Sequence, residues 1–278
     1  MKQKRSMFNK IFEGAFVGVT VITHWLVFYF IIINSFKTKT ESSQLNLSLP
    51  KELNIIENYT YIFKYGNGAF FNAFKNSIIL TVCSIIILVG VASATAFILQ
   101  RRKDKICVVS DKLIVAGLIV PASIIPTYWV LSKLGIANTL TGLIMVEVAT
   151  LFPFATMMYK GFVATLPKEL DEAAAIDGCG PLALFIKIIF PLLKPITATV
   201  VILRSIVVYN DFQNPQYFMS GSNSQTVQLC IYGLKSAFET DYGHLFSAVV
   251  IISAPLIITY LILNKKILEG MTMGAVKG

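Results

Sequence analysis

The most restrictive feature of this sequence is a run of 23 residues, 77–99, that contains no charged side chain. A helix of about 20 mostly apolar residues crosses the roughly 30 Å hydrocarbon core of a bilayer. The run reads SIILTVCSIIILVGVASATAFIL and lacks the alternation of polar and apolar residues that membrane β-strands require. It therefore predicts a transmembrane helix and argues against a β-barrel.

Five further apolar stretches have a similar length, so we predict an all-α, polytopic membrane protein with six transmembrane helices. Hydrophobic residues make up 55% of the chain and charged residues 14%, against roughly 45–50% and 25% in soluble domains. This balance excludes a soluble domain, and the aromatic content of 12% excludes disorder. The predicted spans are residues 14–36, 77–99, 113–134, 140–161, 196–219 and 245–263.

The distribution of Lys and Arg predicts the orientation, because cytoplasmic loops carry the excess of basic residues. The N-terminus, the 101–112 and 160–195 connections and the C-terminus carry 16 of the 24 basic residues. The segments on the other side carry 7, and Arg204 lies inside a span. We therefore predict a multi-pass protein of the cell membrane with both termini in the cytoplasm. The net charge of +9 reflects this topology rather than nucleic-acid binding.

The basic start of the first span resembles a signal peptide. Its apolar stretch is longer than a signal peptide needs, however, and no small-residue cleavage site follows it. This combination favours a retained membrane anchor.

The residues that carry enzyme chemistry do not cluster in this sequence. The four cysteines fall in different segments of the predicted topology, and there is no His-rich, Cys-rich or Ser/His/Asp group. We therefore predict no metal site, no catalytic residue and no enzymatic activity. The phosphate-binding pattern G-x-x-x-x-G-K-[ST] is also missing, so the chain is not a P-loop ATPase itself.

The connection between the fourth and fifth spans, residues 162–195, is far longer than a simple turn requires. Its sequence predicts a short helix, a glycine corner at Gly178 and a second, apolar helix between Pro181 and Pro191. Such a helix suits docking into a groove of a partner, and an interfacial connector without a partner is the alternative. The acidic residues of its first turn, where the helix dipole favours them, are Glu169, Asp171 and Glu172.

The spacing within this connection carries a family resemblance. Glu172-Ala173-Ala174 is followed by three residues, Gly178, nine residues, Ile188, one residue and Phe190-Pro191. This pattern resembles the EAA loop of ABC importer permeases, which has Leu in place of Phe190. The likeness covers nearly the whole chain and is to the carbohydrate-uptake branch, in particular the second permease of maltose-type systems, which has Trp in place of Tyr209. Similar strings are LPKELDEAAAIDG, NSFKT, IVPASIIPTYWVL, YNDF and GMTMGAVKG.

The resemblance implies a binding-protein-dependent importer permease with a helix-turn-helix coupling loop. It implies an N-terminal tail, first helix and external segment at 1–71, a five-helix transmembrane domain at 72–264 and a C-terminal tail at 265–278. The implied partners are a second homologous permease, two cytoplasmic ATPase subunits that use ATP and Mg²⁺, and an external sugar-binding protein. This chain itself would bind no cofactor. The residues expected to contact the ATPase are Glu169, Glu172, Ala173, Ala174, Asp177 and Gly178.

Ionisable side chains inside the predicted spans are costly and are therefore functional candidates; they are His24, Glu147, Arg204 and Asp211. One interpretation is a buried salt-bridge cluster that fixes the fourth span to the fifth. A second is a translocation path, because carboxylates, amides and aromatic faces suit a sugar; its candidates are Glu147, Tyr209, Asn210 and Asp211. The resemblance places the principal membrane sugar site of maltose-type systems in the partner permease. A third is ion-coupled secondary transport through a relay of Glu147, Arg204 and Asp211.

Two prolines fall in the predicted third span. Pro121 and Pro126 each remove a helix hydrogen bond and permit a kink. A kinked inner helix can gate a path, and a static bend is the alternative.

Overall fold

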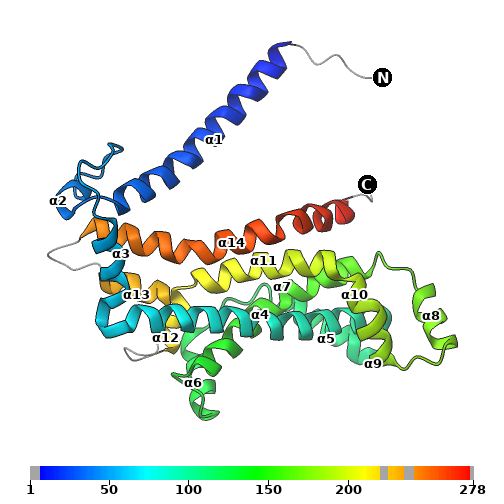
Figure 1. Cartoon of the computed structure of the whole chain (residues 1–278). Coiled ribbons are helices and arrows are strands. Elements are labelled where there is room, and N and C mark those ends of the chain that lie inside the picture. The colour runs from blue at the N-terminus through cyan, green and yellow to red at the C-terminus, as the bar shows by residue number, and fades with distance from the viewer. Residues whose placement is uncertain (1–6, 220–224, 235–240, 276–278) are drawn as a thin grey trace. The chain divides into compact units, whose positions relative to one another are not determined.

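The computed structural model describes residues 7–219, 225–234 and 241–275, which form helices joined by short connections without any β-strand among them (Figure 1). The predicted all-α class is therefore confirmed. The chain divides into two compact units, one of residues 1–70 and 231–254 and the other of residues 71–230 and 255–278. The predicted tails lie partly outside the described residues, at 1–6 and 276–278.

The first unit is dominated by one long apolar helix near the N-terminus. Residues Glu13–Ser35 within this helix are long and apolar enough to cross a membrane. Its apolar side chains are largely exposed, among them Phe16, Ile22 and Trp25, as expected for a surface that faces lipid or another apolar chain. The elements of this unit are α1 (Met7–Ser35), α2 (Lys39–Ser42), α3 (Ile55–Lys64), the 3₁₀ turn η1 (Tyr65–Gly68), the last part of α13 (Val227–Leu234) and the first part of α14 (Tyr242–Ala275).

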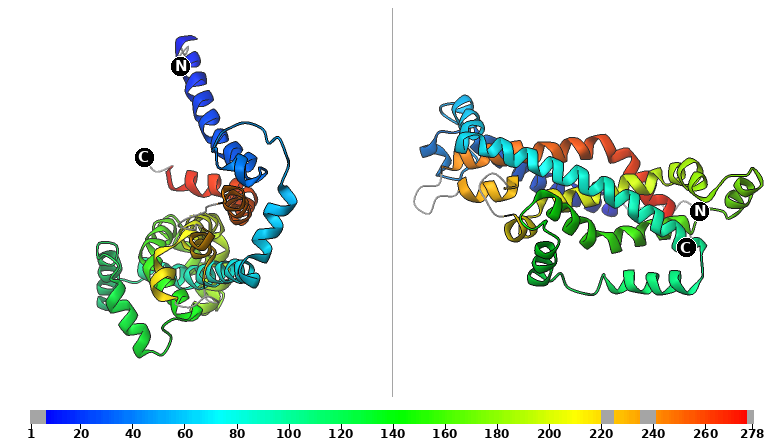
Figure 2. Two further views of the ribbon diagram at one scale, coloured as in Figure 1. Left: turned by 90° about the vertical axis from the view of Figure 1, so that its left-hand side faces the viewer. Right: turned by 90° about the horizontal axis from the view of Figure 1, so that it is seen from below.

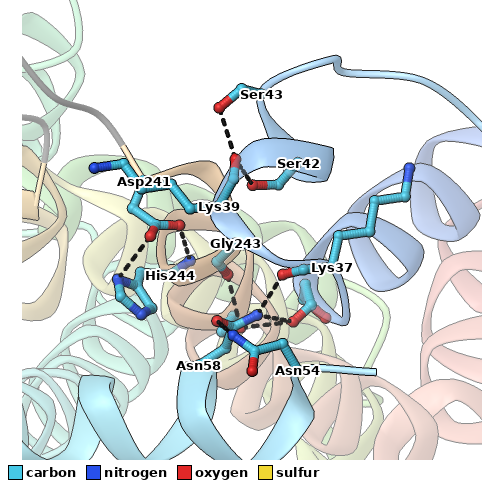
Figure 3. Close-up of polar contacts among 11 residues, drawn as sticks. Lys37, Lys39, Ser42, Ser43, Asn54, Asn58, Asp241, Gly243 and His244 are labelled. Carbon is cyan, nitrogen blue, oxygen red and sulfur yellow. Dashed lines mark hydrogen bonds and ion pairs between the residues drawn. The ribbon is translucent and has the colours of Figure 1, made fainter. Parts of the chain in front are cut away.

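A polar junction joins the end of α1, α3 and the start of α14 (Figure 3). The Asn58 side-chain amide donates to the backbone carbonyls of Ser35 and Lys37, at 2.9 Å each. The His244 ring stacks on Tyr61, with centroids 3.8 Å apart and the planes 5° from parallel. The two hydrogen bonds from Asn58 satisfy backbone carbonyls at and just after the end of α1 that have no partner within the helix.

Lys37 is a buried cation in the same junction. Its ammonium donates to Asn34 Oδ1 at 3.0 Å, to the Asn46 carbonyl at 2.9 Å and to Asn46 Oδ1 at 2.8 Å. Burial lowers the pKa of Lys37 below its ordinary value, and the nearby Glu41 carboxylate opposes that shift. Three oxygen acceptors thus replace the water that an exposed lysine would bind.

The core of the second unit lies among three long helices that run alongside one another, α4, α7 and α11 (Figure 1). The fully buried residues include Leu88 and Ala96 of α4, Leu143 and Tyr159 of α7 and Val200 of α11. The helices are α4 (Ala69–Arg101), α5 (Lys105–Ala116), α6 (Ile124–Lys133), α7 (Leu140–Val163), α8 (Glu169–Ile176), α9 (Pro181–Leu184), the π-turn η2 (Phe185–Ile189), α10 (Phe190–Leu192), α11 (Lys194–Asn210), α12 (Gln213–Phe218), the first part of α13 and the rest of α14.

Four helical segments of the described residues are individually long and apolar enough to cross a membrane. They lie in α1, in α4 with the helical turns before it, in α7 and in α14. A bent pair, Pro181–Leu192 and Lys194–Asn210, meets the same criterion together, with an angle of 74° between its parts. Six continuous spans are therefore not confirmed in the described part of the chain.

The predicted third span, residues 113–134, is wrong as a single helix. α5 ends at Ala116 and α6 begins at Ile124, with turns and irregular chain between them (Figure 2). Pro121 lies in this break, and Pro126 lies in the first turn of α6, where a missing N–H group breaks no helical hydrogen bond. Pro121 thus lies between two helices and Pro126 lies near the start of the second, so neither proline kinks a continuous helix.

The predicted fifth span, residues 196–219, is also interrupted. α11 ends at Asn210, and Asp211 is extended. Its Oδ1 accepts hydrogen bonds from the backbone N–H groups of Gln213 at 2.9 Å and Asn214 at 3.3 Å. The aspartate thereby starts a new helix, α12, in place of continuing the old one.

Candidate functional site

The connection between α7 and α11 contains the expected short helix and glycine corner. α8 has its three acidic residues in the first turn. It ends in a Schellman motif, in which Cys179 N–H donates to the Ala174 carbonyl at 2.9 Å and Gly178 N–H to the Ala175 carbonyl at 3.1 Å. Gly178 has a φ of +72°, in the left-handed region that favours glycine. The chain then turns sharply into α9.

Most of α8 is exposed. Ile176 is 87% exposed although it is apolar, and Ala174 is buried. Of the six residues expected to contact an ATPase, five lie on the exposed surface, which leaves them free to meet another protein: Glu169, Glu172, Ala173, Asp177 and Gly178. Ala174, the sixth, is buried. The exposed surface combines carboxylates with an isolated apolar side chain.

Arg101, at the end of α4, contacts this helix. Its Nε lies 2.6 Å from Asp171 Oδ2, and its Nη2 donates to the carbonyls of Leu166 and Pro167 at 3.3 Å each. Sequence reasoning treated Arg101 only as a topological charge and did not include Asp171 among the contact residues. The two residues are 70 positions apart, and no pattern in the sequence pairs them.

The polar residues near the start of α7 form a second group. The Glu147 side chain is 1% exposed and accepts a hydrogen bond from Asn214 Nδ2 at 3.1 Å. Asp211 accepts a hydrogen bond from the Asn214 backbone. Glu147 and Asp211 thus converge on Asn214, a residue that sequence reasoning missed. Asn214 lies two residues after the YNDF string, but only the fold brings its amide to α7.

Arg204 does not join that group. Its guanidinium lies over the Phe154 ring of α7, 4.1 Å from the centroid, a cation–π contact. Within the part of the chain that the structure describes, it forms no ion pair with Glu147 or Asp211. The expected three-residue charge cluster is therefore not formed, because Arg204 meets an aromatic face on α7 instead of a carboxylate. The contact still connects the helices that correspond to the fourth and fifth predicted spans.

Tyr209 and Asn210 are held apart from Glu147. Tyr209 is buried, its hydroxyl has no hydrogen-bond partner within the described residues, and it lines a cavity of about 340 Å³ with residues of α4 and the later part of α14. Asn210 is exposed and accepts a hydrogen bond from Gln228 Nε2 at 3.1 Å. The four predicted path residues therefore occupy three different surroundings.

The remaining candidates have local roles in the described structure. His24 is exposed on α1, and its Nδ1 lies 2.7 Å from the Thr20 carbonyl oxygen of the preceding turn. Among residues 7–219, 225–234 and 241–275, no group of three or more His, Cys, Asp or Glu side chains could hold a metal ion.

Comparison with known proteins identifies the fold and the family. Residues 86–272 match the family described as binding-protein-dependent transport system inner membrane component. The chain is 30% identical to the melibiose/raffinose/stachyose import permease protein MelC of Bacillus subtilis, over 94% of each chain. It is 32% identical to the probable starch degradation products transport system permease protein AmyC of Thermoanaerobacterium thermosulfurigenes, over 94% of this chain and 95% of that one.

A solved structure has the same fold. A chain of a bacterial ABC transporter involved in the import of the acidic polysaccharide alginate superposes with a TM-score of 0.84 at 18% identity, over 95% of this chain and 98% of that one. The fold, the apolar helices and the match over residues 86–272 agree with the resemblance found in the loop motif. This chain therefore belongs to the family of binding-protein-dependent transport system inner membrane components, which are membrane-embedded transport permeases and not enzymes.

Proposed function

We propose that this chain is a permease subunit of an ATP-driven importer of di- or oligosaccharides in the cell membrane. The observation that carries the proposal is the family match together with relatives named for sugar transport that align over about nine tenths of this chain. A third such relative is the multiple sugar-binding transport system permease protein MsmG of Streptococcus mutans, 32% identical over 88% of this chain.

The exposed face of α8 is the proposed docking surface for a cytoplasmic ATPase subunit. The exposed carboxylates of Glu169 and Glu172 in its first turn and the exposed Ile176 provide charge and an apolar contact. A short helix held on the outside of a compact unit suits insertion into a groove. Movement of the ATPase would then be passed through α8 to the membrane helices and switch the path between inward-facing and outward-facing states.

The proposed assembly contains a second homologous permease, two ATPase subunits and an external sugar-binding protein. The ATPase subunits bind ATP and Mg²⁺, because this sequence has no phosphate-binding loop of its own. Both termini of this chain lie in the cytoplasm in this assembly, since the basic residues are concentrated on that side.

The proposed contribution to the translocation path comes from Glu147, Asn210, Asp211 and Tyr209. Asn214 is added because its side chain donates to Glu147 and its backbone to Asp211. Tyr209 is included because it lines a cavity and its hydroxyl has no partner among the described residues. The ion-relay alternative is less favoured, because Arg204 lies against Phe154 and away from any carboxylate relay.

The test is uptake of labelled raffinose and maltotriose by whole cells that carry wild-type protein or the double variant Glu172→Ala/Gly178→Pro. Membrane abundance and co-purification of the ATPase are measured in the same cells. Proline cannot adopt the φ of +72° found at Gly178, so uptake and ATPase co-purification should fall together at constant abundance. Glu57→Ala, an exposed acid-to-alanine change in α3, is the matched control and should leave both unchanged.

A second arm separates the proposal from ion-coupled transport. Deleting the ATPase gene should abolish uptake, while collapsing the proton and sodium gradients at constant ATP should not. Uptake that survives loss of the ATPase and stops with the gradients would overturn the proposal.

A further inference from the structure

Arg101 occupies an unusual position for an arginine. It is the last residue of α4, and its side chain is only 12% exposed. One guanidinium contacts the Asp171 carboxylate in the first turn of α8 and the two carbonyls, of Leu166 and Pro167, in the chain that leads into that helix. The planar group carries five N–H donors in a fixed geometry, so it can hold a carboxylate and backbone carbonyls together.

The two ends of this contact differ in how firmly they are held. α4 is fixed in the core of the second unit by the buried residues Leu88, Ala92 and Ala96. α8 has few other attachments, since Ala174 is its one buried residue. The ion pair thus connects a firmly packed helix to a largely exposed one.

The next arginine provides an internal comparison. Arg102 Nε lies 2.8 Å from Asp104 Oδ2, but the two side chains are 68% and 38% exposed. The partners are two residues apart in the sequence, and Asp104 also caps α5 by accepting from Cys107 N–H at 3.1 Å. The Asp171 side chain is 22% exposed, so the Arg101 pair is much better shielded from water. Ion pairs on an exposed surface contribute little to stability, whereas charged hydrogen bonds that are shielded from water are stronger.

We propose that Arg101 is a positioning residue that ties α8 to α4, so that a displacement of either helix is transmitted to the other. The use of this tie in transport rests on the proposed function. Arg101 contacts neither cargo nor nucleotide; it acts by fixing the position and direction of α8. Lysine at this position would keep the charge but lose the geometry that reaches the carboxylate and both carbonyls.

The first experiment measures the tie itself, in inverted membrane vesicles that contain the intact complex. Cys83, Cys107 and Cys230 are replaced by alanine, which leaves Cys179, one residue beyond the Gly178 corner of α8, as the only thiol of this chain. Its rate of reaction with a maleimide reports how freely the corner moves. The near-isosteric Asp171→Asn should raise the rate about tenfold, the effect of losing one charged hydrogen bond. Arg101→Ala also removes the hydrogen bonds to the Leu166 and Pro167 carbonyls and should raise the rate at least as much.

Arg102→Ala is the matched control and should leave the maleimide reaction rate of Cys179 within about twofold of the rate measured with Arg102 present. The exchange Arg101→Asp/Asp171→Arg should restore part of the protection, which a general folding defect would not allow. Unchanged rates in both single variants would overturn the proposed tie.

The second experiment measures coupling in proteoliposomes, as raffinose or maltotriose imported per ATP hydrolysed. Arg101→Lys should lower this ratio about tenfold, while the complex stays assembled and hydrolyses ATP. A residue needed only for folding or assembly would lower hydrolysis and import in parallel.

Failure of this inference is distinguishable from failure of the proposed function. If wild-type import needs ATP but Arg101→Lys keeps the normal ratio, the coupling role is wrong and the importer assignment stands. If wild-type import does not depend on the ATPase while Arg101→Ala still raises the rate at which Cys179 reacts with the maleimide, the importer assignment fails. The tie between α4 and α8 then stands.

Discussion

The two ends of α7 are built in different ways. Near its start, a Cβ at Gly142 would clash with the Ile136 carbonyl oxygen, and Glu147 is buried against Asn214. Near its end, Gly161 has open space around it, and the chain continues into the exposed α8. Glu147 and Gly161 are separated by about 21 Å of helix. The start of the helix is thus a tightly packed polar joint, whereas near its end Gly161 has free space around it and the chain leads into an exposed segment.

The largest expected effect on stability comes from adding a side chain at Gly142, near the start of α7. Gly142→Ala should destabilise the protein by about 3 kcal/mol, at the upper end for overpacking, because a backbone carbonyl stands in the way of the added methyl group. Gly161→Ala should instead stabilise it by about 0.5–1 kcal/mol, through helix propensity alone. Thermal denaturation of the purified protein in detergent measures both. Equal melting temperatures for the two variants would remove the contrast between the ends of α7.

The next largest effect on stability is expected for the buried hydrogen bond between Asn214 and Glu147, near the start of α7. Glu147→Leu should cost about 2 kcal/mol, because it leaves the Asn214 amide without its acceptor. Glu147→Gln preserves an acceptor and is the control. Adding Asn214→Leu to Glu147→Leu should recover much of the loss, as a double-mutant cycle in detergent would reveal. Strictly additive effects would mean that the two side chains do not depend on each other.

A smaller loss of stability is expected at the Gly178 corner, which follows α8. Gly178→Ala should cost about 1–2 kcal/mol, because an L-residue is strained at a φ of +72°. Gly180 has no such constraint and equally open surroundings, so Gly180→Ala is a matched control with little expected change. The measurement is the fraction of complex that retains its ATPase after mild heating. If both alanine variants retain it equally, the corner geometry does not matter for docking.

The smallest change in stability is expected for a hydroxyl group. Tyr209→Phe removes a hydroxyl that has no partner in the described structure, so stability should change by less than about 1 kcal/mol. Sugar uptake should nevertheless fall about fivefold if this hydroxyl pairs with cargo. Tyr159→Phe is the control, because its hydroxyl donates to Thr197 Oγ1 at 3.1 Å; it should lower stability and leave uptake unchanged. Normal uptake with Tyr209→Phe would exclude Tyr209 from the path.

Local sequence patterns predicted the helices correctly wherever the position or end of a helix depends on neighbouring residues. The charge-free run at 77–99 lies within α4, and the acidic first turn and Gly178 predicted the ends of α8 to within a few residues. Helix length, dipole and glycine conformation depend on neighbouring residues alone. The same local reasoning failed at 113–134 and 196–219, because apolar content does not reveal where Pro121 or Asp211 ends a helix.

Local sequence patterns had the same limit at the candidate sites. The loop residues could be found from one continuous motif. Asn214 and Arg101 could not, because their partners Glu147 and Asp171 are 67 and 70 positions away. The expected charge cluster failed for a related reason, since depth along two helices does not say which faces meet, and Arg204 met Phe154.

The sequence by itself determined the membrane class, the all-α fold, the loop helix with its glycine corner and the family resemblance. Each of these follows from composition, from residues within a few turns of one another or from a continuous motif. Only the tertiary structure decided that Arg101 holds α8, that Asn214 links Glu147 to Asp211 and that Tyr209 faces a separate cavity. Such contacts depend on which helix faces pack together, and that is set by the combined packing of α4, α7 and α11.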